Sequence, residues 1–353
     1  MIADTEWEQA AATRVFLNRW NELHQSIQQL SLDQLDEQAQ PVRFPIEFDS
    51  INTLLPNTQE MRSAARMLSL HGQVAVLDGN STQVRLDVEA LLGCSKALHG
   101  EPILVSQLVS IAIDSMGVEL LKRALEQDVL EERDLMLLLP HVLAKTGIGP
   151  EYRVALHGEI AMMLPVFDNP GMAGEEGATR LPARGNDMLH YLEHMESVLA
   201  ADESGDLGEF MADLQASEAN LEKLFDAGPI VAFDSILTGL LAPATAASGQ
   251  AFVRSTLHRM AAICIGIRLY EKKHARLPTS LAELVDVGVD ATQLTAPSNQ
   301  SFGFSVDAEQ NALVWGYDIR TESAVPPVPP TLDPGEPDLD TKRLYRWELP
   351  TKQ

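Results

Sequence analysis

The feature that most constrains the fold is an almost unbroken apolar stretch at residues 103–121. A helix of this kind has no polar side to turn toward water, so other protein segments must surround it. Gln107, Asp114 and Glu119 interrupt the stretch, and these side chains would be costly inside lipid. We therefore predict the central helix of a bundle, and no direct insertion of this chain into a membrane.

Amphipathic helices are predicted on both sides of this stretch, because apolar residues recur there at three- and four-residue steps. In the first of them, the recurring residues are Phe16, Trp20, Leu23, Ile27 and Leu30. The predicted helices cover residues 7–38, 58–77, 81–99, 131–145, 151–163, 187–200, 207–225, 230–241 and 250–274. No fixed period relates them, which favours a mainly α fold built as an irregular helical bundle or a helical-repeat-like array.

Glycine and proline mark several predicted helix ends. Gly79 can adopt the left-handed conformation that ends a helix, and Asn80 or Ser81 can cap the next one. Pro102 indicates the start of the central helix, since proline is tolerated in a first turn. A stretch rich in glycine and proline, residues 165–186, is predicted to be a long loop.

The character of the sequence changes after residue 277. Ser280 and Glu283 have the spacing of a capping box for a short helix at residues 281–285. Beyond it we predict a strand, a turn, a second strand, a proline-rich linker that cannot enter a sheet and a third strand, at residues 301–306, 307–311, 312–317, 323–337 and 344–347. The chain thus divides into a helical domain, residues 1–277, and a small α+β segment, residues 278–353.

Charge and composition disfavour several classes of partner. The chain has 51 acidic and 26 basic residues, a formal net charge of −25. Nucleic acids and anionic membranes are bound mainly through lysine and arginine, so neither is an expected partner. Cys94 and Cys264 lie in apolar helical patterns and are predicted to be buried thiols, and a disulfide between them is the alternative that the sequence leaves open. The first residues lack a signal-peptide pattern, which predicts a cytoplasmic protein as the chain stands and an extracytoplasmic one if an N-terminal anchor was removed.

Two stretches resemble known proteins. One is residues 61–124, and the other runs from residue 268 to 304 with the segments RLYE, LPTSLAEL and FGF. Both resemble a family of uncharacterised bacterial helical proteins that are often membrane-anchored outside the cytoplasm. The second is also similar, more loosely, to the C-terminal part of pseudopilin-like secretion subunits.

This resemblance implies a mainly helical protein at the bacterial envelope, and the family has no established activity to carry over. The sequence departs from the pattern in two places. It lacks the N-terminal anchor usual in that family, which leaves the location open, and the acidic, glycine-rich loop of pseudopilin tails. The second departure removes the basis for a metal site in the C-terminal segment.

His190, Glu193 and His194 match the H-x-x-E-H pattern of inverted zinc peptidases. Two imidazoles one helical turn apart would bind zinc, Glu193 would activate the metal-bound water, and Glu271 lies downstream as a candidate third ligand. The helical wheel favours an ordinary polar face instead, because an apolar stripe turns the motif toward solvent. The stripe consists of Met188, Leu192, Met195 and Leu199.

Other patterns are weaker. Residues 202–213 and 333–340 are acidic, but the first lacks the ligand spacing of a calcium loop and the second reads as an exposed acidic tail. The sequence contains no phosphate-binding loop and no nucleophile elbow. Six further histidines show no metal-ligand spacing, namely His71, His99, His141, His157, His258 and His274. From the sequence we assign no cofactor, no metal ion and no catalytic residue.

The function expected from the sequence is that of a non-enzymatic scaffold or protein-interaction protein at the bacterial envelope. Surplus acidic charge on a helical surface favours a basic protein or peptide as the partner. The alternative is a zinc-dependent hydrolase that uses His190, Glu193 and His194. The two functions differ in one testable respect, because the hydrolase needs Glu271 within coordinating reach of the histidine pair.

Overall fold

The computed structural model describes residues 9–36, 38–39, 42, 56–144, 150–168, 185–201, 244–296, 300–317 and 344–350, with single positions between 212 and 226. Its long helices are α1 (Ala10–Arg19), α2 (Asn21–Asp33), α3 (Pro56–Leu77), α4 (Ser81–Lys96), α5 (Leu104–Glu126), α6 (Glu132–Leu143), α7 (Pro150–Asp168), α8 (Gly185–Ala201) and α12 (Ala244–His274). Two 3₁₀ helices and three strands follow: η4 (Leu281–Val287), η5 (Ala291–Leu294), β1 (Gly303–Val306), β2 (Ala312–Tyr317) and β3 (Leu344–Leu349). The predicted fold class, mainly α with a small α+β part, is confirmed.

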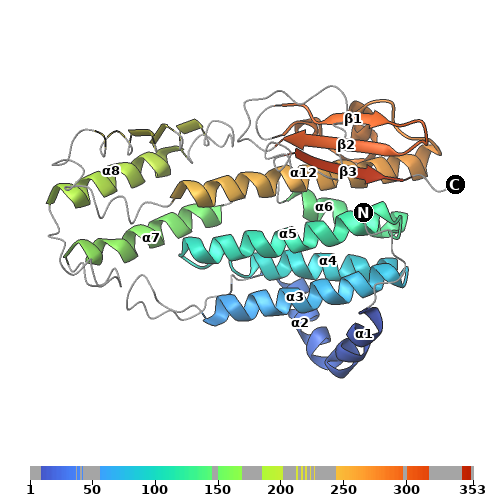
Figure 1. Cartoon of the computed structure of the whole chain (residues 1–353), viewed down its shortest axis with the longest axis horizontal. Coiled ribbons are helices and arrows are strands. Elements are labelled where there is room, and N and C mark those ends of the chain that lie inside the picture. The colour runs from blue at the N-terminus through green and yellow to red at the C-terminus, as the bar shows by residue number, and fades with distance from the viewer. Residues whose placement is uncertain are drawn as a thin grey trace.

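The central helix of the bundle is α5, as its apolar sequence predicts. It packs against α3, α4, α7 and α12, while α6 lies against α4 and α12. Among the described helices, α5 is the one long and apolar enough to cross a membrane, and 67% of its most apolar window is buried inside the protein. Figure 1 shows the sheet on one side of this bundle and α1 and α2 on the other, with α7 and α8 at one end of the long axis.

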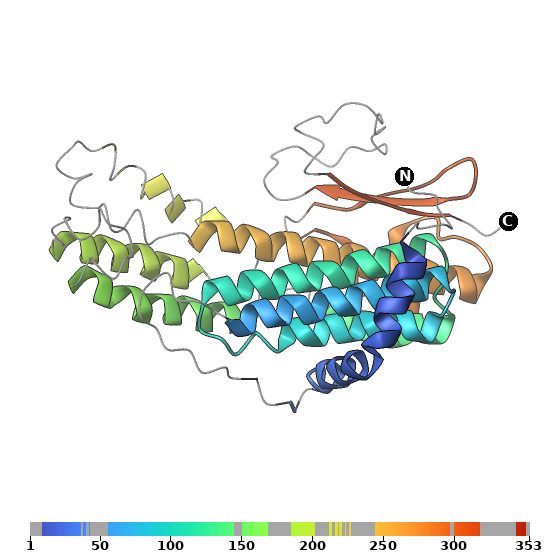
Figure 2. The ribbon, with the colours of Figure 1, turned by 60° about the horizontal axis from the view of Figure 1, so that its bottom comes forward.

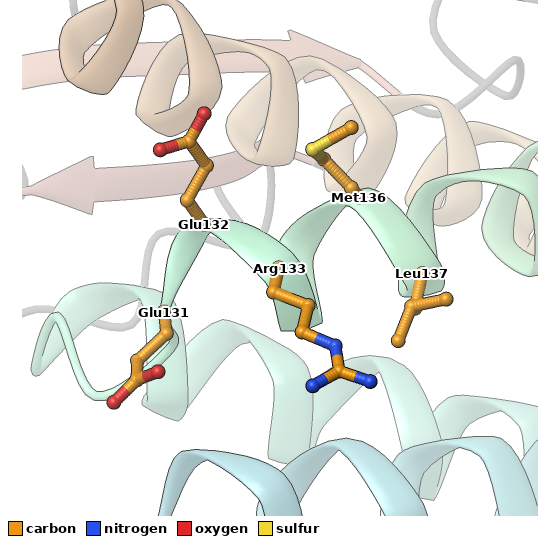
Figure 3. Close-up of a pocket in the computed structure, with 5 residues that line it drawn as sticks. All are labelled: Glu131, Glu132, Arg133, Met136 and Leu137. Atoms are coloured by element: carbon orange, nitrogen blue, oxygen red, sulfur yellow. The ribbon is translucent and has the colours of Figure 1, made fainter.

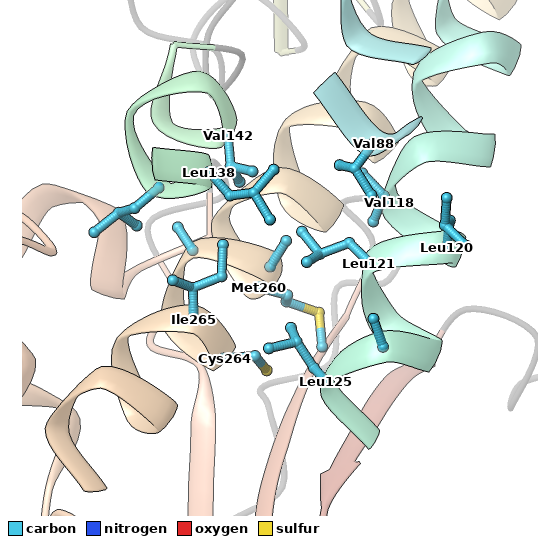
Figure 4. Packing of buried hydrophobic residues seen from close by; sticks show 14 of the residues in the cluster. Val88, Val118, Leu120, Leu121, Leu125, Leu138, Val142, Met260, Cys264 and Ile265 are labelled. Carbon is cyan, nitrogen blue, oxygen red and sulfur yellow. The ribbon is translucent and has the colours of Figure 1, made fainter. Parts of the chain in front are cut away.

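The main hydrophobic core lies where α5, α6 and α12 meet. Leu121 and Leu125 of α5 and Leu138 of α6 face Met260 and Cys264 of α12 (Figure 4). The same core continues into the C-terminal segment through buried residues of η4, β2 and β3, which include Leu284, Val314, Trp347 and Leu349. The helix α12 therefore has apolar neighbours on both its bundle side and its sheet side.

A second hydrophobic cluster joins α7 and α8 to the start of α12. It contains Tyr191 and Met195 of α8 and Phe252 of α12. The prediction that a loop begins at residue 165 was wrong, because α7 continues through Pro165 to Asp168 and α8 begins at residue 185. Val166 and Phe167 are buried in this cluster, and their burial offsets the local cost of proline in the last turn. The rest of the predicted loop lies outside the described residues.

The junction between α3 and α4 follows its local sequence signals. Gly79 has φ +66°, and the side chain of Asn80 accepts a hydrogen bond of 3.1 Å from the backbone N–H of Gln83. The predicted start of α5 at Pro102 was wrong, since the helix begins at Leu104. There the carboxylate of Glu159 in α7 accepts a 2.9 Å hydrogen bond from the Leu104 N–H, so a distant residue replaces the local signal.

The three strands form one antiparallel sheet in the order β1-β2-β3. The register pairs Val306 with Ala312 across the β1–β2 hairpin and Tyr317 with Leu344 at the far end of β2 and β3. β2 and β3 pack on α12, and β3 also contacts α5. Figure 2 shows the sheet lying along α12. The predicted strands are thus present, and the linker predicted between the last two lies outside the described residues.

The capping box predicted before η4 has a different partner. The Ser280 side chain makes no capping hydrogen bond, and Glu283 instead accepts one of 2.9 Å from the backbone N–H of Thr279. The hydroxyls of Thr279 and Tyr270 also donate to this carboxylate. These donors, led by the Thr279 hydroxyl, hold the pKa of Glu283 well below its ordinary value.

Candidate functional site

The helix α2 is inverted relative to an ordinary surface helix. Its buried residues are His24 and Ser31, which are both polar. Leu23 and Leu30 face outward, with 48% and 67% of their surface exposed. A surface helix usually buries apolar side chains and exposes polar ones. In α2, the buried polar residues and the exposed leucines both depart from this arrangement.

The neighbouring helix α1 also exposes apolar side chains. Val15, Phe16 and Trp20 are exposed, and the chain breaks between the two helices at Trp20. The single helix predicted over residues 7–38 was therefore wrong, and its apolar repeat does not mark a buried side, apart from Ile27, which packs partly against the core. Isolated exposed apolar residues are common in proteins, but five large ones within sixteen residues resemble an interaction surface. We call Val15, Phe16, Trp20, Leu23 and Leu30 the outer apolar face.

The inner face of α2 meets a buried carboxylate on α4. The Oδ1 atom of Asp87 lies 3.3 Å from Nε2 of His24 and accepts a 2.7 Å hydrogen bond from Gln28. Its Oδ2 atom lies 2.7 Å from Nδ1 of His71 on α3 and accepts a 3.3 Å hydrogen bond from Gln83. Three helices thus converge on one acidic side chain that is fully buried.

The two imidazole rings of this cluster lie face to face. Their centroids are 3.8 Å apart, and their planes are inclined by 26°. The side chain of His24 is 3% exposed and that of His71 is 23% exposed, so the cluster opens to solvent on the His71 side. We call His24, His71 and Asp87 the triad.

Two glycines allow the three helices to come this close. A Cβ atom at Gly93 of α4 would lie 1.8 Å from the carbonyl oxygen of Ser31, which places the α2 backbone directly against α4. A Cβ atom at Gly72 of α3 would lie 3.2 Å from the Cβ atom of Asp87. The close approach at Gly93 brings α2 near enough for His24 and Gln28 to reach the Asp87 carboxylate.

The triad has the chemistry of a ligand set. A buried carboxylate must be compensated, and here two amides and two imidazoles supply four polar contacts. Among the described residues, the triad is the one group of three His, Cys, Asp or Glu side chains whose potential ligand atoms all lie within 4.8 Å of one another. Two imidazoles and a carboxylate are typical ligands of zinc and of other divalent transition metals.

The hollow on α6 is less promising as a site. It has a volume of about 460 Å³ and is lined by Glu131, Glu132, Arg133, Met136 and Leu137. All five side chains come from the first turns of one helix and its N-cap, and Figure 3 shows them pointing in different directions. An enzyme pocket brings polar groups from several elements onto one point, and this hollow has no such convergence among its lining residues.

The histidine pair on α8 does not have the exposure predicted for it. Glu193 is exposed, as expected, but His194 is buried together with Tyr191 and Val198, so the predicted solvent face was wrong for His194. The helical-wheel prediction was wrong because the buried side of α8 is shifted by one position from the predicted stripe. Tyr191 and Val198 are buried, whereas Met188, the first residue of that stripe, is exposed. Nδ1 of His194 lies 3.0 Å from the Ser217 hydroxyl, and burial lowers the pKa of this imidazole.

Glu271 cannot serve as the third ligand of that pair. The helix α8 packs in the same cluster as Phe252. Glu271 lies 19 residues further along α12, which at 1.5 Å per residue corresponds to about 28 Å. There it accepts a 2.8 Å hydrogen bond from the buried Arg268. None of the described residues completes a metal site with His190 and His194.

Both cysteines are buried and free, as predicted. Burial raises the pKa of Cys94 to about 12 and raises that of Cys264 as well. A thiol must lose its proton to act as a nucleophile, so neither sulfur is suited to catalysis.

Comparisons with known proteins add no further assignment: no model of a protein family, no curated protein and no solved structure matches this chain.

The triad escapes sequence reasoning because its members are far apart in the chain. His24 and His71 are separated by 47 positions and come together only when α2 and α3 both pack on α4. A weaker signal was present in the sequence, since Gln83 and Asp87 interrupt the apolar side of α4 one turn apart. Polar residues at helical spacing on a core-facing side indicate a buried polar partner, but not which one.

Proposed function

We propose that this protein is a non-enzymatic interaction protein that docks a partner through the outer apolar face of α1 and α2. The observation that carries the proposal is the exposure of Phe16 and Trp20, which are aromatic side chains of the kind enriched at protein interfaces, and Leu23 is exposed as well. The bundle beneath these helices is a rigid support, because α3, α4 and α5 share one apolar core.

The partner expected from this surface is an amphipathic helix with a basic rim. Apolar side chains at helical spacing are recognised by a complementary apolar face or groove. The net charge of −25 attracts cationic partners over a distance and accelerates their association at low salt. The resemblance to membrane-anchored bacterial proteins supports the cell envelope as the place to look for this partner.

The test compares two double variants of the full chain. Trp20→Glu with Leu23→Glu places two charges on the outer apolar face. Val154→Glu with Leu189→Glu is the matched control, since it makes the same change at exposed apolar positions on α7 and α8, at one end of the long axis (Figure 1). Proteins of an envelope extract that the native chain and the control retain, but the first variant does not, are then purified.

Affinity for the purified partner decides the proposal. Loss of central interface residues typically costs about 2 kcal/mol or more, so we expect the first variant to bind at least about 30-fold more weakly. The control should bind like the native chain, and association should slow as salt is raised. Equal binding by the native chain and the first variant would contradict docking at this face.

The alternative function, a zinc-dependent hydrolase using His190, Glu193 and His194, has less support. Its proposed third ligand lies on a distant part of α12, and His194 is buried. Elemental analysis of the variant His190→Ala with His194→Ala tests it directly. Loss of stoichiometric zinc in this variant would favour the hydrolase.

A further inference from the structure

We propose that His24, His71 and Asp87 bind one divalent transition-metal ion, with zinc as the expected ion, and that this ion fastens α2 to α3 and α4. The inference goes beyond the docking function and holds whether or not α1 and α2 bind a partner. It explains why His24 is buried on the inner face of α2, where Ile27 and Leu32 pack partly against the main core.

The distances in the triad are close to those of a zinc site. Ligand atoms around tetrahedral zinc, with bonds of about 2.0–2.1 Å, lie about 3.3 Å apart. The imidazole nitrogens of His24 and His71 lie 3.3 Å and 2.7 Å from the two oxygens of Asp87. The stacked rings must turn apart so that both nitrogen lone pairs face one ion.

The hydrogen bonds that would orient the ligating carboxylate are already in place. Gln28 and Gln83 donate to Asp87 from α2 and α4, one to each carboxylate oxygen. Ligating carboxylates are typically held by such hydrogen bonds, which fix their orientation. When the ion binds, the imidazole nitrogens give up their contacts with Asp87 and coordinate the metal, while the two amide contacts remain.

Charge and access also favour a cation here. One carboxylate balances at most one protonated imidazole, whereas a divalent ion uses two neutral imidazoles and the carboxylate at once. The partial exposure of His71 provides an entry path from solvent, and a water is the expected fourth ligand. The protein surface carries a large acidic excess, which raises the local concentration of cations.

The test is zinc binding by the full, tag-free chain after removal of metal with a chelator. We expect one zinc ion per chain by elemental analysis. Loss of a residue that only holds a ligand in place weakens metal sites by about 10–100-fold, so His71→Ala, which removes a ligand itself, should lower zinc affinity by at least about 100-fold. His24→Gln removes the other imidazole ligand and should also lower zinc affinity. His157 on α7 is exposed, so His157→Ala is the matched control and should bind zinc like the native chain.

Hydrogen exchange tests the fastening of α2. Zinc should slow exchange of the α2 amides in the native chain and should not do so in His71→Ala. Absence of stoichiometric zinc would overturn the proposal, as would equal binding by the native chain and His71→Ala. Loss of zinc from His190→Ala with His194→Ala, but not from His71→Ala, would place the ion on α8 and overturn it too. Zinc binding without any change in α2 exchange would refute the fastening role.

Discussion

The helices α2 and α5 both pack on α4, but they differ in which side chains they turn toward water. α5 buries most of its residues among α3, α4, α7 and α12, and exposes a narrow stripe that includes Val105 and Leu108. α2 turns His24 and Ser31 inward and leaves Leu23 and Leu30 outside. The difference lies in what α4 offers to each: Val88, Leu91 and Leu92 join the apolar core, whereas Asp87 and Gly93 receive α2. Helical periodicity in a sequence shows that a helix has two faces, but its neighbours decide which face is buried.

The largest expected effect separates a leucine in the core from a leucine on the outer apolar face. Leu121→Ala removes a fully buried side chain of α5 and should lower the free energy of unfolding by about 2–5 kcal/mol. Leu30→Ala on α2 should change it by less than about 0.5 kcal/mol. Urea unfolding of both variants measures the contrast, and similar losses would mean that Leu30 is packed in the folded protein.

An intermediate effect is expected where α2 rests on α4. Gly93→Ala places a methyl group where the Ser31 carbonyl oxygen lies, so α2 must move away. Overpacking of this kind typically costs about 1–3 kcal/mol. Hydrogen exchange should accelerate at the α2 amides and stay unchanged at those of α5, which serves as the internal control. Faster exchange in both helices would show that the two regions unfold as one unit.

The smallest effect concerns His194, a buried histidine whose hydrogen-bond partner among the described residues is the Ser217 hydroxyl and not a carboxylate. Burial holds the pKa of His194 below its ordinary value of 6.5, so the unfolded chain binds this proton more readily than the folded one. Stability from this group is therefore present above pH 6.5 and is lost as the pH falls toward the folded-state pKa. Unfolding at pH 5 and pH 7.5 should show a weaker loss for His194→Asn than for the native chain. His157→Asn, an exposed site, should keep the native pH dependence.

Much of the fold is readable from the sequence because its signals are local. The turn at Gly79 and Asn80, the central helix and the strands β1 and β2 follow from short segments. The sequence failed where distant residues replaced those signals. Glu159 sets the start of α5 from α7, and the burial of Phe167 carries α7 past a proline.

The candidate site was less predictable for the same reason. The H-x-x-E-H pattern of α8 can be recognised in the sequence because its five residues are contiguous. The triad depends on three helices and on two glycines that allow their close approach, and neither is encoded in a local spacing. A buried ligand set assembled by packing leaves only scattered polar interruptions in the sequence, such as Gln83 and Asp87 on α4.

The pairing of Tyr317 with Leu344 has a practical consequence. The chain leaves the sheet at one residue of this pair and returns at the other, so the two ends of the intervening segment are held about 5 Å apart by the sheet itself. The entropy of closing a loop grows slowly with its length, and doubling the length costs only about 0.6 kcal/mol. The fold should therefore tolerate a fluorescent or affinity module inserted between these two strands. The sheet lies on the side of the bundle opposite to α1 and α2, so the module would leave those two helices uncovered (Figure 1).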